Sequence, residues 1–249
     1  MSLRGTALIV FVLLIAGPAR AEQLEGKYLY QVTTLRADSG KLSELLDWLA
    51  EMKTSSYYKD SGDLPPFVMR HSQGDQWDLM IIKPMESWTK FHSRPAANRR
   101  EKAQSKHAEE IVAGSVLIAF SEDHFAYGPS LSEFKSAFAQ SGFFHIEMFM
   151  AEPGKASELL KQRLMENAYL AATGQSPNMI FHRAAGSDVD VFTIGFYESL
   201  EAFAAPAPAS DEEKEVAAKA AGFANRADLS FYLRSLISGH HDTLAVKVE

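Results

Sequence analysis

Two ionisable side chains stand two residues apart in an apolar segment of the second half of the chain. His145 and Glu147 alternate with Phe144, Ile146 and Met148. Because side chains alternate across a strand, this spacing predicts a strand with the polar pair on one face. Such a pair costs free energy unless it is satisfied, for instance by a polar cavity. We therefore predict a catalytic pair, with His145 as general base and Glu147 orienting it. The alternative is a hydrogen-bonded structural pair.

A second candidate set lies at the ends of two other predicted strands. Arg70 and His71 in the first half correspond to His182 and Arg183 in the second, in inverted order. An arginine beside a histidine can hold a carboxylate or an enolate. We therefore predict that these four residues bind substrate, with Arg183 or His182 holding an anionic group beside His145. The alternative is two pairs of strand-end charges in water.

A metal site is an alternative to this acid–base site. His240, His241 and Asp242 stand at the start of the last predicted strand. If that strand pairs antiparallel with the strand of His145, then His241 approaches Glu147. His145, Glu147 and His241 would form a set of two histidines and one carboxylate. The main prediction includes no cofactor. A haem-binding histidine is a further alternative, which Soret absorbance and metal analysis would test.

Several classes of protein are excluded by what the sequence lacks. It contains no HExxH, CxxC or GxSxG motif and no phosphate-binding glycine loop, which argues against zincins, serine hydrolases and P-loop enzymes. The formal net charge of −7 argues against a nucleic-acid partner. The absence of cysteine excludes disulfides and thiol chemistry.

The elements that must position these residues occur twice. Residues 40–46 read GKLSELL and residues 154–160 read GKASELL, at an offset of 114. Residues 62–91 align without a gap with residues 174–203, at an offset of 112. Each aligned segment contains two predicted strands around a glycine turn, which is typical of a hairpin. Two such islands in the same order indicate a duplicated unit.

The periodicities predict the same order of elements in each half. A helix follows each GK-SELL motif, and another follows each Glu-Ser pair. The predicted strands cover 29–35, 67–71, 78–82 and 125–127, and then 143–150, 179–183, 190–196 and 243–248. This order is β-α-β-β-α-β twice, the ferredoxin-like arrangement. We predict one unit over residues 22–130 and a second over residues 131–249.

The first twenty-one residues predict export. Arg4 precedes an apolar run over residues 7–16, and Ala19-Arg20-Ala21 supplies small residues where a signal peptidase cuts. The run is about half of the ~20 residues needed to span a bilayer. We therefore predict a signal peptide over residues 1–21, cleavage after Ala21, and a periplasmic or secreted protein without a membrane anchor.

The repeated motifs resemble those of a known superfamily. A strand leads into Gly-Lys and an amphipathic helix, a hairpin follows, and residues 86–91 read ESWTKF. With these features the chain resembles the dimeric α+β barrel superfamily, and within it NIPSNAP-like and antibiotic-biosynthesis-monooxygenase-like domains. The resemblance covers nearly the whole mature chain as two tandem copies. It implies an α+β fold in which two ferredoxin-like units form one intramolecular barrel, as a monomer or a loose homodimer.

The resemblance is compatible with three classes of function. The first hypothesis is an exported protein that binds a small organic molecule, with cofactor-independent oxygenase or isomerase chemistry. The second is a non-catalytic binding or interaction module. The third is a haem or metal binder. Fold alone does not choose among them.

Overall fold

The computed structural model describes residues 28–248. The predicted signal peptide over residues 1–21 lies outside the described residues and stays a prediction. Among the helices of the described range, none combines the length and the apolar character needed to cross a membrane.

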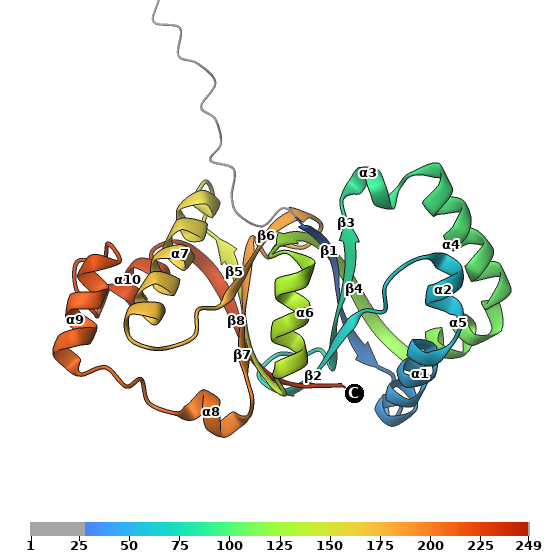
Figure 1. Cartoon of the computed structure of the whole chain (residues 1–249), viewed down its shortest axis with the longest axis horizontal. Coiled ribbons are helices and arrows are strands. Elements are labelled where there is room, and N and C mark those ends of the chain that lie inside the picture. The colour runs from blue at the N-terminus through green and yellow to red at the C-terminus, as the bar shows by residue number, and fades with distance from the viewer. Residues whose placement is uncertain (1–27, 249) are drawn as a thin grey trace, which may run out of the picture.

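In the described part of the chain, eight strands form one closed antiparallel barrel (Figure 1). Around the barrel the order is β1-β3-β2-β8-β5-β7-β6-β4. The strands are β1 (Tyr28–Ala37), β2 (Phe67–Gln73), β3 (Leu79–Glu86), β4 (Ile118–Gly128), β5 (Phe143–Ala151), β6 (Met179–Ala185), β7 (Val191–Tyr197) and β8 (Ile237–Lys247). Two seams join the halves, where β2 pairs with β8 and β4 pairs with β6. The expected α+β barrel built from two ferredoxin-like units of one chain is confirmed.

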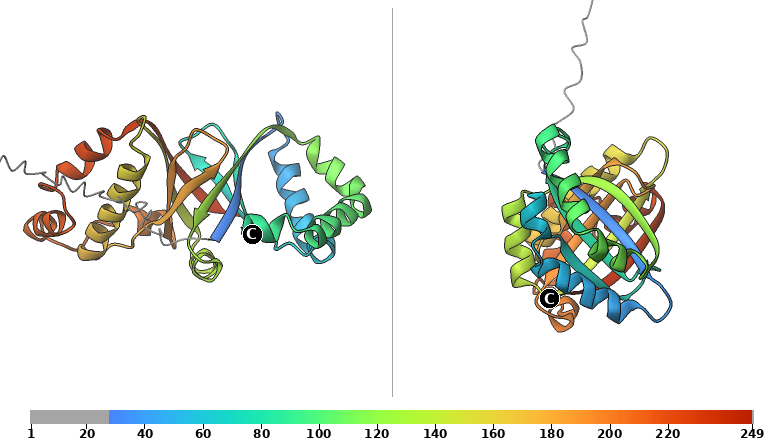
Figure 2. Two further views of the ribbon diagram at one scale, coloured as in Figure 1. Left: turned by 90° about the horizontal axis from the view of Figure 1, so that it is seen from above. Right: turned by 90° about the vertical axis from the view of Figure 1, so that its right-hand side faces the viewer.

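Helices cover the outside of the barrel in two groups (Figures 1 and 2). The first half carries α1 (Leu42–Thr54), α2 (Tyr57–Ser61), α3 (Trp88–Phe91), α4 (Arg94–Lys106) and α5 (Ala108–Ser115). The second half carries α7 (Ala156–Ala172), α8 (Leu200–Ala204), α9 (Asp211–Ala220) and α10 (Asp228–Arg234). Between the halves lies α6 (Leu131–Gln140).

The two halves share one strand register. Val32 of β1 lies opposite His124 of β4, and Ile146 of β5 lies opposite Thr243 of β8. Val32 and Ile146 are 114 residues apart, which is the offset of the GK-SELL motifs. In both halves the pairing shifts register four residues after these positions. The repeat therefore extends from the motifs to the backbone pairing, including its bulge.

The last strand of each half is longer than the sequence indicated. β4 begins at Ile118 and β8 at Ile237, well before the predicted starts. The added residues, IAFSEDH and ISGHHD, are polar enough to suggest loops. They pair instead with the long strands β1 and β5, because tertiary pairing overrides a weak local preference. This extension places three histidines in strands.

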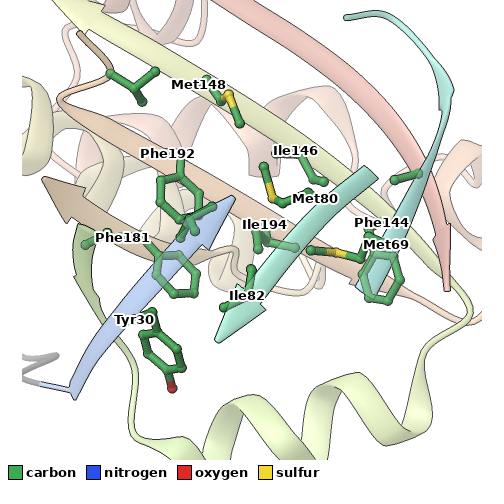
Figure 3. Close-up of a cluster of buried hydrophobic side chains, with 14 of the residues drawn as sticks. Tyr30, Met69, Met80, Ile82, Phe144, Ile146, Met148, Phe181, Phe192 and Ile194 are labelled. Carbon is green, nitrogen blue, oxygen red and sulfur yellow. The ribbon is translucent and has the colours of Figure 1, made fainter. Parts of the chain in front are cut away.

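The barrel interior is filled with apolar side chains (Figure 3). Tyr30, Ile82, Phe181 and Ile194 are all fully buried there. At one end, α6 closes the barrel. Its Phe134 is fully buried, with its ring 5.7 Å from that of Tyr30. Residues that alternate with this core, His145 among them, therefore point outward, toward the helices.

Candidate acid–base site on the outer face of the second half

His145 and Glu147 lie on the outer face of β5, between β7 and β8. Their side chains are 19% and 14% exposed. Ile146 and Met148 point into the barrel, as the alternation predicts. The polar pair therefore lies between the sheet and the helices of the second half.

Asp242 of β8 binds His145. The His145 Nε2 atom lies 2.5 Å from the Asp242 Oδ1 atom. Since an ionised carboxylate only accepts hydrogen bonds, Nε2 carries a proton and donates a hydrogen bond to Asp242. In the neutral ring the other nitrogen, Nδ1, is then an acceptor. This is the arrangement in which a carboxylate fixes the tautomer of a histidine base. The ring of Phe203, from α8, lies 5.0 Å from the imidazole.

Glu147 is held by two other side chains. The Thr193 hydroxyl donates to it over 3.1 Å, and the Arg163 guanidinium lies 3.5 Å from the same Oε2 atom. Arg163 comes from α7 and is 2% exposed. It donates to Gln162 over 2.7 Å and to Glu166, and its guanidinium lies 4.6 Å from the centre of the Phe149 ring. A charge buried this deeply requires such partners.

Burial shapes the titration of the groups around this pair. Desolvation raises the pKa of Glu166, although the adjacent Arg163 charge acts in the opposite direction. Desolvation also raises the pKa of Tyr197, and the nearby Glu147 charge adds to the effect. Glu166 and Tyr197 therefore hold their protons more tightly than they would in water.

Among the described residues, the first half has no counterpart of this cluster. At the offsets of the repeat, Glu147 corresponds to Thr33, Arg163 to Leu49 and Glu166 to Met52. Thr33 donates instead to Asp123, the counterpart of Asp242. Duplication therefore kept the scaffold in both halves and placed the charged set in the second.

The metal set expected from the sequence differs by one residue from the set that the structure assembles. His241 lies opposite Met148 and shares its inward face, with Nδ1 3.3 Å from Asp75. Asp242 takes the expected place near Glu147, because neighbours in a strand point to opposite faces. His145, Glu147 and Asp242 each offer one donor atom, and these atoms lie within 4.8 Å of one another.

The predicted substrate-binding residues are not assembled around His145. β7 separates His182 and Arg183 from β5, and β8 separates Arg70 and His71 from it. Each pair is also split, because adjacent strand residues face opposite ways. Arg183 is bound to Asp190 at 2.6 Å.

Sequence reasoning missed Arg163, Glu166 and Thr193. The repeat itself carried a usable signal for Arg163. At the offset of 114, the apolar Leu49 aligns with Arg163, whereas the neighbouring Leu45 and Leu46 align with leucines. A charged residue that replaces a leucine on the buried face of a duplicated helix indicates that the position takes part in hydrogen bonds or ion pairs.

No family model and no curated protein matches the sequence. Solved structures do match. An anthrone oxidase-like protein is 14% identical with a TM-score of 0.58, over 90% of this chain and 93% of that chain. A proposed monooxygenase from Lactobacillus acidophilus NCFM is 8% identical with a TM-score of 0.49, over 90% and 95%. A mutant chlorite dismutase from Candidatus Nitrospira defluvii is 13% identical with a TM-score of 0.48, over 90% and 94%. The first likeness, together with the barrel topology, establishes the fold and assigns no activity.

Proposed function

We propose that this protein, which has the dimeric α+β barrel fold in tandem form, binds a small organic molecule beside His145 and takes a proton from it. The observation that carries the proposal is the 2.5 Å contact between His145 Nε2 and Asp242. It leaves Nδ1 as the proton acceptor of a ring whose orientation is fixed. The cluster around it is confined to the second half, which points to one site per chain.

The surroundings of His145 favour a planar aromatic substrate. The Phe203 ring lies 5.0 Å from the imidazole, and the Tyr197 ring lies 5.2 Å from that of Phe203. Aromatic rings of this kind pack against flat, polarisable molecules. The buried Arg163 is committed to Glu147 and Glu166 and so supports the site rather than holding an anion. The anion-binding role expected for Arg183 or His182 is not part of this proposal.

Proton abstraction is the step that two hypotheses share. In an isomerase, the substrate anion regains the proton at another atom. In a cofactor-independent oxygenase, the anion transfers electrons to O₂, and the reduced oxygen bonds to the deprotonated carbon as a peroxide, which takes the proton back from the imidazolium. In both cases His145 Nδ1 receives the proton, and Asp242 stabilises the resulting imidazolium.

The experiment follows O₂ uptake and the ultraviolet spectrum of anthrone, a polycyclic probe with an acidic C–H bond. We expect His145→Gln to slow turnover by about 10²–10⁴-fold, the usual contribution of a general base. His92→Gln, at an exposed position in the first half, is the matched control and should keep the wild-type rate. Equal rates in the two variants contradict the role of His145. Binding of anthrone without turnover favours the non-catalytic binding module.

A metal centre is the second candidate, because three donor atoms converge at His145, Glu147 and Asp242. The guanidinium 3.5 Å from Glu147 opposes it, since a divalent ion would enter beside a fixed positive charge. Metal analysis and Soret absorbance of the purified protein distinguish the candidates. We expect chelation to leave anthrone turnover unchanged; loss of turnover that zinc or iron restores would establish the metal centre instead.

Export is also part of the proposal. The pattern over residues 1–21 supports it, with an arginine, a ten-residue apolar run and a small-residue end. N-terminal sequencing of protein from the native host should begin at Glu22. A chain recovered with residues 1–21 attached would contradict export by this signal.

A further inference from the structure

The barrel has a second feature of functional interest at the end opposite α6. A cavity of about 650 Å³ opens there between the turn that joins β2 to β3 and the turn that joins β6 to β7. Met148 lies in its wall, at the end of the core away from α6 (Figure 3). We call this cavity the barrel mouth. Its volume is within the ordinary range of small-molecule pockets.

A buried histidine in the barrel mouth lacks a partner. His124 lines the cavity and is 3% exposed, and its Nε2 atom has no hydrogen-bond partner among the described residues. Desolvation lowers the pKa of His124 to about 4, so the ring is neutral near pH 7. Next to the cavity, His71 packs against Trp77 with ring centres 5.7 Å apart, and its Nε2 atom is buried without a partner as well. Unpaired buried polar atoms are costly, and a bound molecule offers a partner.

The charges around the barrel mouth are mainly negative. Asp75, Glu122 and Asp188 line it, and we call these three residues the acidic rim. Arg36 opposes them, and His241 lies 3.3 Å from Asp75. The excess of carboxylates attracts a cation and repels an anion.

The deeper wall of the cavity is apolar. Trp77, Met148 and Val189 line it and are each less than 10% exposed. The indole N–H of Trp77 donates to Asp75 over 2.9 Å, which ties this wall to the acidic rim. The cavity therefore combines an apolar surface with a negatively charged opening.

We propose that the barrel mouth binds a small organic cation, with its ammonium group at the acidic rim and its apolar body against Trp77, Met148 and Val189. A polar group on the body, or the ammonium itself, donates to His124. This site is separate from the one proposed for proton transfer, because His145 points to the outer face of the same barrel. It therefore does not depend on the function proposed for His145.

The test compares three probes of one shape and different charge, which are 2-phenylethylamine, 2-phenylethanol and 3-phenylpropionate. Calorimetric titration of the full mature chain should show the amine binding at least about tenfold more tightly than the carboxylate, as expected for charge-assisted contacts. The His124 imidazole resonances and the Trp77 fluorescence should change on titration with the amine. Equal or tighter binding of the carboxylate overturns the proposal, as does the absence of amine binding at millimolar concentration.

Matched variants separate a specific site from general charge attraction. Glu122→Gln with Asp188→Asn removes two charges of the acidic rim. Glu109→Gln with Glu212→Gln removes the same number from exposed positions on α5 and α9. We expect the first pair to weaken amine binding about tenfold and the second to change it less than twofold. The same loss in both pairs shows that the amine follows net charge alone, and the proposal fails.

Discussion

At the scale of single residues, Arg163 is the buried charge that depends most on its ion-pair partners. A guanidinium that is 2% exposed depends on Glu147 and Glu166 for its charge balance. Arg163→Leu leaves two carboxylates without that partner, and we expect it to lower the free energy of unfolding by about 3–5 kcal/mol. Urea unfolding followed by circular dichroism measures this loss.

The first half of the chain supplies the compensating control. Its residues at the equivalent positions are threonine, leucine and methionine. The triple variant Glu147→Thr, Arg163→Leu and Glu166→Met should recover most of the stability that the single variant loses, because no buried charge remains unpaired. Arg234→Leu, at an exposed position, should change the free energy of unfolding by less than about 0.5 kcal/mol. If Arg163→Leu is as stable as the wild type, the ion pairs of Arg163 do not contribute to the free energy of unfolding.

His124 should make the stability depend on pH between about 6.5 and 4. Burial lowers the pKa of His124 to about 4, so between these pH values the ring is protonated in the unfolded chain and neutral in the folded chain. The contribution of His124 to the free energy of unfolding is therefore fully present above pH 6.5. It falls by about 3 kcal/mol as the pH drops to about 4. Burial also lowers the pKa of His182 and adds to the loss. The Asp60 hydrogen bond raises the pKa of His107, so the contribution of His107 is lost only as the pH rises above about 6.5 and stays constant in this window.

The comparison of His124→Gln with the wild type isolates this contribution. We expect the variant to unfold with a flatter dependence on pH in this window, as measured by thermal melts at constant ionic strength. His92→Gln should keep the wild-type slope. If the slope of His124→Gln is also unchanged, the ring is not the desolvated neutral group that its burial indicates.

The sequence predicted some residue positions and not others for a physical reason. Alternation within one strand placed His145 and Glu147 on one face correctly. The partner strand cannot be treated in this way, because its register depends on long-range pairing, and a shift of one residue exchanges its faces. That is why His241 was expected beside Glu147 and Asp242 lies there instead.

At the scale of elements, α6 matters because it closes the barrel on one side. Ser130 and Glu133 form a capping box at its start, and Phe134 fills the core below it. Phe134→Ala removes a fully buried ring and should lower the free energy of unfolding by about 3–5 kcal/mol. Ser130→Ala removes one cap and should cost about 1 kcal/mol. Chemical unfolding measures both losses.

A matched control for this helix lies on α10. Phe231 is 72% exposed, so Phe231→Ala should change the free energy of unfolding by less than about 0.5 kcal/mol. Similar losses at both phenylalanines would show that α6 is not needed to seal the core. The sequence analysis placed no helix over residues 131–140, although the spacing of Ser130 and Glu133 is the signature of a capping box.

At the scale of the whole molecule, duplication explains how one chain closes a barrel. The repeated motifs predicted two ferredoxin-like units, and the resemblance to the dimeric α+β barrel superfamily implied that the two units form one barrel. The seams, β2 with β8 and β4 with β6, join residues that no local pattern relates. They leave no free strand edge in the barrel, and such edges are what drive chains to pair. We therefore expect a monomer in solution, and light scattering during size-exclusion chromatography measures its mass.

Gly74 allows that expectation to be tested at a seam. It lies in the turn after β2 with a φ of +125°, and a Cβ atom there would come 2.1 Å from the backbone oxygen of Asp242 on β8. Gly74→Ala should therefore push the turn away from β8, lower the melting temperature and expose strand edges that pair between chains as a dimer.

Gly154→Ala is the control for backbone strain, because Gly154 also has a positive φ, of +80°, and nothing lies within 4 Å of its added Cβ atom. It should cost only about 1–2 kcal/mol and remain monomeric. A monomeric Gly74→Ala protein with the same melting temperature as Gly154→Ala would show that this seam does not hold the barrel closed.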